Sequence, residues 1–313
     1  MDEVNKKNNS NDFDEIDLQE IFYFLLENKR IIFSLTALAS TIGVIVSLLL
    51  PNIYESKAML VPVNASSGIS ATLQNYSGLA GLAGISLPSS EDEDNSTKAI
   101  EKIQSLSFFE NNILPNIFLP DLMALKFWDH ETNSLVYDEN IYNKYTNAWV
   151  RSYRYPQKQI PSAQESFEEY ITKFFSVTQS IDTGFITISI KHQSPFIAKQ
   201  WTELIVLEIN NFYRQKDKSE AEKAVSYLNE QILMTGLTEI KQVISELLRE
   251  ETQKLALIEA NEFYVFDYID PPAVMEEHEE PNRIIICIIS LFLGAIIGII
   301  FVLLKYYRLE KSN

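Results

Sequence analysis

The sequence predicts an α+β domain with a long protruding helix, held between two transmembrane helices. Two apolar runs, Ile31 to Leu50 and Ile284 to Leu304, contain no charged side chain. Between them, strand-like and helix-like patterns alternate, and one stretch from Ser219 to Asn261 contains no proline. At 1.5 Å per residue, each apolar run spans roughly 30 Å, the thickness of a bilayer's hydrocarbon core.

Two other interpretations of the apolar runs fit the sequence less well. A buried core helix of this length would carry a polar face, and these runs offer only Ser, Thr and Gly. Ala37-Leu38-Ala39 resembles a signal-peptide cleavage site, but the apolar run continues to Leu50 beyond it. Both runs are therefore expected to remain as membrane anchors.

Basic residues at the ends of the runs predict the topology. Lys29 and Arg30 precede the first run, and Lys305, Arg308 and Lys311 follow the second, whereas glutamates dilute the basic residues at the opposite ends. By the positive-inside rule both termini are cytosolic and the main domain is outside. The expected order is a cytosolic segment 1–30, membrane helix 31–50, external domain 51–283, membrane helix 284–304 and cytosolic tail 305–313.

Composition argues against several kinds of chemistry. The formal net charge of -17, without a cluster of Lys or Arg, argues against nucleic acid. His130, His192 and His278 are far apart and show no metal-ligand spacing, and no nucleophile motif is present. The single cysteine, Cys287, lies inside the second apolar run. We therefore expect no catalytic, cofactor or metal site.

The first part of the external domain is expected to begin with a strand from Tyr54 to Val63. Residues 64–95 are rich in Ser, Gly and acidic side chains and are expected to form a mobile loop. Its glycines are not followed by Lys, so a phosphate-binding loop is not supported. Ser96 then begins a helix with apolar residues at helical spacing.

Residues 121–163 are irregular and rich in aromatic side chains. Trp128, Trp149, Tyr153 and Tyr155 are compatible with sugar stacking, but aromatic residues of such a region more often form its own core. Lys173 to His192 is expected to form a hairpin that turns at Gly184, and Ser194-Pro195 to begin an amphipathic helix that covers the sheet.

The segment from about 219 to 261 is expected to be one very long helix. Its apolar positions repeat at helical spacing, with an irregular step at Gly236 that indicates a stutter. A helix of more than 40 residues would reach roughly 60 Å, longer than the domain can cover. It therefore needs partners, most simply copies of itself, which predicts a homo-oligomer.

Phe263 to Ile269 is expected to form the last strand, paired with the first because both adjoin the membrane. A Pro-rich stretch, 271–283, with Pro271, Pro272 and Pro281, then leads into the second membrane helix. There Ser290, Gly294 and Gly298 recur every four residues, a spacing that lets another helix approach closely.

The order of these segments resembles that of the chain-length determinant (Wzz) family of bacterial inner membranes. The most specific pieces are Ile16-Asp17-Leu18 before the first membrane helix, and Asp270-Pro271-Pro272-Ala273 with Pro281-Asn282-Arg283 before the second. The resemblance implies a non-enzymatic periplasmic regulator that forms rings. It implies a Wzy-type polymerase as partner, with a lipid-linked glycan as a further candidate, and control of the length of lipopolysaccharide O-antigen. The glutamates between Pro272 and Pro281 depart from the family's proline-rich motif.

Three alternatives stay open. Relatives that serve capsule or exopolysaccharide export often carry a kinase with a Walker motif, which is absent here. A two-helix membrane sensor would share the topology but would need a cytosolic output domain, for which the tails are too short. A membrane-anchored glycan enzyme would need a pair of carboxylates that folding brings together.

Overall fold

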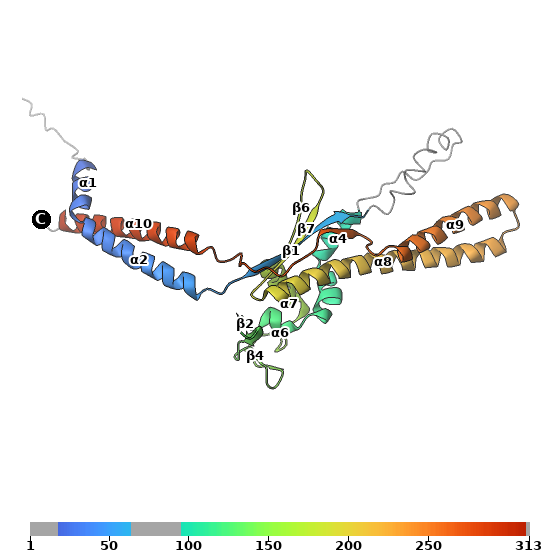
Figure 1. Cartoon of the computed structure of the whole chain (residues 1–313), viewed down its shortest axis with the longest axis horizontal. Helices are drawn as coiled ribbons and strands as arrows, with labels where there is room; N and C mark the ends of the chain where they lie inside the picture. Colours follow the sequence, from blue (N-terminus) through green and yellow to red (C-terminus); the bar gives the residue numbers. More distant parts are fainter. Residues whose placement is uncertain (1–17, 64–94, 311–313) are drawn as a thin grey trace, which may run out of the picture. The chain divides into compact units, whose positions relative to one another are not determined.

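The computed structural model describes residues 18–63 and 95–310, and its elements are shown in Figure 1. Residues 1–17, which include Ile16-Asp17, and nearly all of the Gly-rich loop 64–95 lie outside the described residues. The chain divides into two compact units. One is formed by the two terminal parts, up to Pro51 and from Pro281, and the other is Asn52–Glu280.

The terminal unit is built from α1 (Leu18–Glu27), α2 (Lys29–Leu49) and α10 (Arg283–Glu310). Helices α2 and α10 contain the two predicted apolar runs and pack against each other. Each is long and apolar enough to cross a membrane. At one end of the pair, Lys305 Nζ donates a hydrogen bond to Asn28 Oδ1 at 3.3 Å, and the ring of Phe24 contacts that of Tyr306.

The second unit is organised around a four-stranded antiparallel sheet in the order β6-β7-β1-β8. Its strands are β1 (Tyr54–Pro62), β6 (Phe175–Gln179), β7 (Ile186–His192) and β8 (Phe266–Asp270). The predicted hairpin is confirmed, with Gly184 at φ 71° in the turn. The pairing of the first and last strands is also confirmed, so both connections to the membrane helices leave from neighbouring strands.

The core lies between this sheet and the first half of α8 (Pro195–Met234). Side chains of β1 and β7, such as Leu60 and Ile188, are fully buried, as is Ile205 on α8. The hydroxyl of Thr202 donates a hydrogen bond to the Ser56 carbonyl of β1 at 3.3 Å. The predicted cover of the sheet by an amphipathic helix is thus confirmed.

Short helices complete the core. They are α4 (Asn95–Ile103), α5 (Leu106–Phe108), η1 (Phe109–Ile113), η2 (Leu114–Asn116), α6 (Leu119–Met123), α7 (Ala163–Glu169) and η3 (Tyr170–Phe174). The ring of Tyr170 contacts that of Phe109 in a tilted arrangement and stacks on that of Phe175, with centroids 4.9 and 5.3 Å apart. Aromatic burial therefore joins η1 to η3 and to the sheet.

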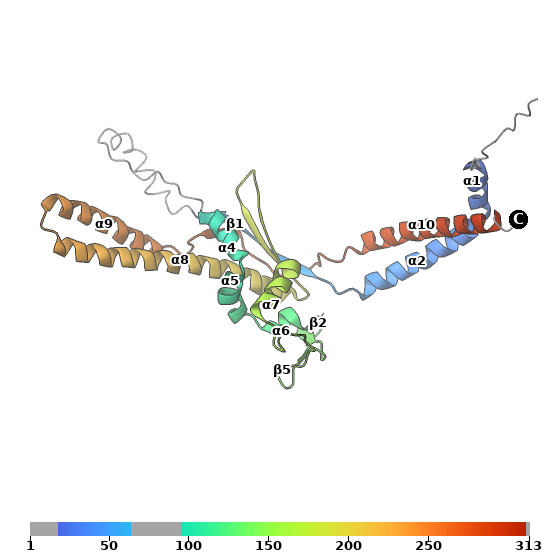
Figure 2. The same cartoon turned by 180° about the vertical axis from the view of Figure 1, so that it is seen from behind.

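The expected single helix over 219–261 is wrong. Helix α8 starts at Pro195 and continues to Met234, because no proline or glycine interrupts it. The chain then turns at Thr235, Gly236 and Leu237, and α9 (Thr238–Ala260) packs back along α8. Figures 1 and 2 show the two helices side by side as a hairpin. The irregular step at Gly236 marks a reversal of the chain rather than a stutter.

The aromatic region forms two small sheets, β2 (Leu125–Asp129) with β3 (Ser134–Tyr137), and β4 (Tyr142–Asn143) with β5 (Ala148–Trp149). Tyr142 is buried at 3% exposure and contacts the rings of Phe118, Tyr137 and Trp149. The interpretation as a local core is confirmed for Trp149, whereas Tyr153 and Tyr155 are 56% and 92% exposed.

Candidate functional site

The predicted small-residue face of α10 lies against α2 of the same chain. Gly294 and Gly298 are buried. A Cβ added to Gly294 would stand 2.6 Å from the Cβ of Ala39, and one added to Gly298 would stand 3.1 Å from the Cα of Ile32. Such distances are shorter than van der Waals contact, so only glycine allows this approach of the two helices.

The third predicted residue, Ser290, packs opposite a glycine that the sequence analysis missed. A Cβ on Gly43 of α2 would overlap the Ser290 side chain, whose hydroxyl donates to the Cys287 carbonyl at 2.9 Å. Gly43 is the only glycine in the first apolar run, and that was the signal available. The three small residues thus serve a contact within the chain, and their effect on assembly or on a polysaccharide stays a prediction.

The Pro-rich stretch follows β8 along the edge of β1. Pro271 is exposed and Pro272 is buried. Ser56 Oγ of β1 donates to the Ala273 carbonyl at 2.9 Å. Prolines cannot donate to a β-ladder, so this side-chain bond holds the segment where backbone pairing stops.

The stretch rejoins β1 just before the second membrane helix. Ile53 N donates to the Glu280 carbonyl at 2.9 Å, and Glu279 N donates to the Ile53 carbonyl at 2.8 Å. Pro281 follows directly. The carboxylate of Glu280 also pairs with Lys191 of β7, which raises the pKa of that lysine. We call the end of the domain formed by Ile53, Lys191 and Glu280 the base.

The base therefore holds the two chain connections side by side. Ile53 lies two residues after Pro51, and Glu280 lies three residues before Arg283, where α10 begins. Backbone bonds, rather than exposed ion pairs alone, make this bridge, so it is not sensitive to salt.

The helical hairpin is fastened to the domain at its open end. Arg214 of α8 donates to the carbonyls of Asn261, at 2.8 Å, and Glu262, immediately after α9. Lys218 pairs with Glu259 one turn further along α8. Cations at the C-terminus of a helix offset its partial negative charge, so both contacts fix the end of α9.

A buried asparagine joins α8 to the entry of β8. Asn210 is 4% exposed, and its Oδ1 accepts hydrogen bonds from the backbone N–H groups of Tyr264, Val265 and Phe266 at 3.0, 2.7 and 3.1 Å. Its Nδ2 donates to the carbonyl of Phe266 at 3.1 Å. This single side chain satisfies polar backbone groups where the chain leaves the hairpin and enters the sheet.

Toward its turn the hairpin exposes apolar side chains. Leu233, Met234 and Leu237 are 85%, 69% and 60% exposed, and Ile240 and Val243 follow at 45% and 59%. We call these five residues the hairpin tip. By contrast, Ala221 of α8 and Ile258 of α9 are buried. The two helices thus cover each other near the domain, and the hairpin tip is open to a partner.

The buried titratable groups have structural surroundings. Burial lowers the pKa of His192 to about 4, and the ring packs against Trp201 and Phe174. Its Nδ1 accepts from Ser194 N at 2.9 Å. Burial also raises the pKa of Asp121, although the Tyr137 hydroxyl donates to it at 2.6 Å. Across residues 18–63 and 95–310, no group of His, Cys, Asp and Glu has the arrangement of a metal site.

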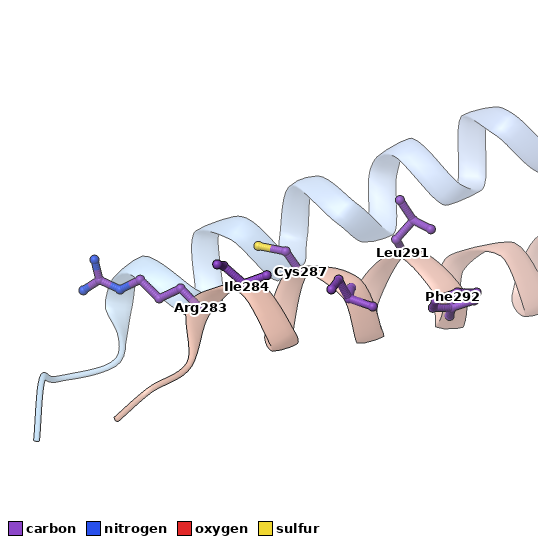
Figure 3. Close-up of a pocket in the computed structure, with 6 residues that line it drawn as sticks. Arg283, Ile284, Cys287, Leu291 and Phe292 are labelled. Carbon is purple, nitrogen blue, oxygen red and sulfur yellow. The ribbon is translucent and has the colours of Figure 1, made fainter. Parts of the chain in front are cut away.

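One shallow groove runs along α10. It is lined by Arg283, Ile284, Cys287, Ile288, Leu291 and Phe292. In Figure 3, Arg283 marks one end of the groove, and the remaining lining residues are apolar apart from the Cys287 thiol. All six residues come from a single helix, and this surface is open to lipid or to another membrane helix.

Comparisons with known proteins find one family and two solved structures that this chain is similar to. The family model described as "Chain length determinant protein" (Wzz) matches residues 14–113. No curated protein matches significantly. A solved full-length bacterial polysaccharide co-polymerase is 14% identical over 95% of this chain and 99% of its own, with a TM-score of 0.41. A fragment of WzzB, a polysaccharide co-polymerase from Salmonella Typhimurium, is 12% identical over 73% and 100%, with a TM-score of 0.30.

The family match carries the conclusion, because both structural likenesses are weak. It covers α1, α2, β1 and the helices as far as η1. These elements include the first membrane helix and the strand at the centre of the base. The predicted resemblance to the chain-length determinant (Wzz) family is therefore confirmed over residues 14–113, in a chain with two helices able to span a membrane.

Proposed function

We propose that this chain is a non-enzymatic inner-membrane regulator of polysaccharide chain length. The observation that carries the proposal is the match of residues 14–113 to the chain length determinant model. The function proposed is to set the modal length of lipopolysaccharide O-antigen by acting on a Wzy-type polymerase as an oligomeric scaffold. No cofactor is required for such a role.

The arrangement of the elements suits a scaffold. Helix α10 packs on α2 through glycines, and the base bridges the two connections with backbone hydrogen bonds. The two chain connections are therefore held next to each other at the base, which suits a scaffold that is anchored at two points.

The experiment is deletion of the gene and complementation with variants, followed by a lipopolysaccharide gel. A change of modal length with polymer still present supports regulation. Loss of all polymer would support an enzyme instead. If the lipopolysaccharide length is unchanged but the capsule or exopolysaccharide is altered, the chain is instead a co-polymerase for capsule or exopolysaccharide export. No change in any polysaccharide would favour a membrane sensor.

We place the domain in the periplasm and both termini in the cytoplasm. Lys29 and Arg30 stand at the start of α2, and Lys305 and Arg308 stand at the far end of α10, which are the same end of the helix pair. Alkaline phosphatase fused near Ser162 should be active and a fusion after Asn313 inactive. The reverse pattern would refute the orientation.

The hairpin tip supports the proposed homo-oligomer. Its five apolar side chains protrude from the domain without a cover in the described part of the chain. Replacing Leu233 and Leu237 by Ser should lower the mass of the detergent-solubilised particle, because it removes apolar surface from the contact. Lys241→Ser, on an exposed polar side chain of the same hairpin, is the matched control. A wild-type particle that is monomeric at low micromolar concentration would refute the assembly.

A further inference from the structure

An aromatic and apolar surface lies at the base of the domain, away from the helical hairpin of α8 and α9. It contains Tyr54, Trp128, Phe196, Val274 and Met275, which we call the base patch. The ring of Trp128 lies 5.6 Å from that of Tyr54 and 6.4 Å from that of Phe196. Tyr54 of β1, Trp128 of β2 and Phe196 at the start of α8 thus meet from distant parts of the sequence, and the Pro-rich stretch is held to β1 nearby by the bond from Ser56 to Ala273.

Much of the base patch is open to solvent. Phe196, Val274 and Met275 are 48%, 39% and 44% exposed. The last two lie between Ala273, which is bonded to Ser56, and Glu280, which is bonded to Ile53. Apolar side chains gathered in this way on a soluble surface indicate a contact surface.

Chain connectivity limits how far the base patch can lie from the membrane. Tyr54 is the fourth residue after Leu50, the end of the apolar run. An extended chain covers at most about 3.6 Å per residue, so their Cα atoms lie within about 14 Å of each other. The second connection, from Glu280 to Arg283, is limited to about 11 Å in the same way. Two short tethers therefore keep this end of the domain within about 14 Å of the ends of the apolar runs.

The chemistry of the base patch fits the bilayer interface. Tyr and Trp gather at the headgroup level, where an apolar ring and a polar edge are both accommodated. Trp128 Nε1 already donates to Asn133 Oδ1 at 3.0 Å, so the indole can leave water without an unsatisfied donor. The neighbouring exposed Glu276, Glu277 and Glu279 would repel anionic lipids, which favours zwitterionic headgroups.

We propose that the base patch lies in the headgroup region of the bilayer that the chain's own helices cross, so that the domain rests on the lipid surface. A headgroup layer is roughly 5 to 8 Å deep on each side of the hydrocarbon core, a depth that the two tethers can reach. This contact would fix the tilt of the domain independently of any partner protein. It does not depend on the proposed role in polysaccharide length.

The test is quenching of Trp128 by brominated lipid. The full chain is placed in nanodiscs of phosphatidylcholine brominated close to the headgroup, with Trp149 and Trp201 replaced by Phe so that Trp128 alone emits. We expect its emission to be lost relative to unbrominated lipid, and the loss to be insensitive to salt. A matched protein that retains only Trp201, which is 2% exposed in the core, should not be quenched.

Two further variants keep the test decisive if the double replacement fails to fold. In the otherwise wild-type chain, Trp128→Phe should remove the quenchable part of the emission. Phe196→Ser should reduce quenching of Trp128, whereas Ile181→Ser, at a fully exposed residue in the turn between β6 and β7, should not. Equal emission of Trp128 in brominated and plain lipid would overturn the proposal. The proposal would also be overturned if Trp128 were protected from aqueous iodide only after a polymerase is added, because the base patch would then bind a protein rather than lipid.

Discussion

Replacing Asn210 by Ala should destabilise the domain more than its position in the middle of a long helix suggests. The substitution removes the acceptor of three backbone N–H groups, of which those of the buried Val265 and Phe266 have no access to water. An unsatisfied buried donor costs about 1–3 kcal/mol. Because the three donors share a single oxygen, their contributions do not add fully, and we expect a loss of about 2–4 kcal/mol.

A loss of that size is a large part of the 5–15 kcal/mol that stabilises a typical domain. It should appear as a lower urea midpoint in the unfolding of the full chain in detergent, followed by the fluorescence of Trp201, a buried residue of α8. Asn211→Ala is the control, since that neighbour is half-buried and makes no side-chain hydrogen bond in the described part of the chain. A loss below about 1 kcal/mol, or equal losses for both variants, would show that water replaces the amide and would refute the reasoning.

Three further predictions follow from other contacts. Burial lowers the pKa of His192 from an ordinary 6.5 to about 4, so the neutral ring stabilises the fold fully above pH 6.5, and this stabilisation is lost progressively between pH 6.5 and 4. His192→Gln should flatten the dependence of the unfolding free energy on pH in that range, by up to about 3 kcal/mol. Gly294→Leu should separate α2 from α10 and lower cross-linking between cysteines placed on the two helices, whereas Ile296→Leu, on the exposed face, should leave it unchanged. Arg214→Ala should free the end of α9 and speed proteolysis of the hairpin, while Arg249→Ala, in an exposed pair within α9, should not.

The sheet could be predicted from the sequence because its signals are local. Alternating apolar residues mark the hairpin arms, Gly184 marks the turn, and the short connections of the first and last strands to the membrane helices favour their pairing. The end of α8 could not be predicted. Its apolar stripe is equally compatible with a copy of the chain and with α9, because a helix face does not specify what covers it.

The residues of the candidate site also differ in how far the sequence could predict their roles. Ser290, Gly294 and Gly298 could be assigned to one face by their spacing, but their partner helix could not be identified before Gly43 and Ala39 were seen opposite them. The role of Asn210 had no signal at all, since an asparagine within a helical pattern is usually an exposed surface residue. Its function depends on backbone groups more than fifty residues away.

The last prediction concerns the Pro-rich stretch as the link between domain and bilayer. Each proline fixes φ and restricts the residue before it, so Pro271, Pro272 and Pro281 limit the conformations of the chain around the base. Replacing all three by Ala should cost about 0.4–1 kcal/mol each through the unfolded state. The backbone bonds between Ile53 and Glu280 do not involve proline and should hold the fold together. We therefore expect wild-type expression and membrane insertion with an altered modal polysaccharide length.

The control for that triple variant is Pro115→Ala, at an exposed proline in η2, which should leave the length unchanged. The readouts are a lipopolysaccharide gel and an immunoblot of membrane fractions from the same cells. Two results would contradict the assigned role in opposite ways. An unchanged length profile at wild-type protein level would mean that the backbone bridge at Ile53 and Glu280 suffices to orient the domain. Complete loss of polymer would instead mean that the stretch takes a direct part in polymerisation, since a change of angle alone leaves the polymerase able to extend a chain.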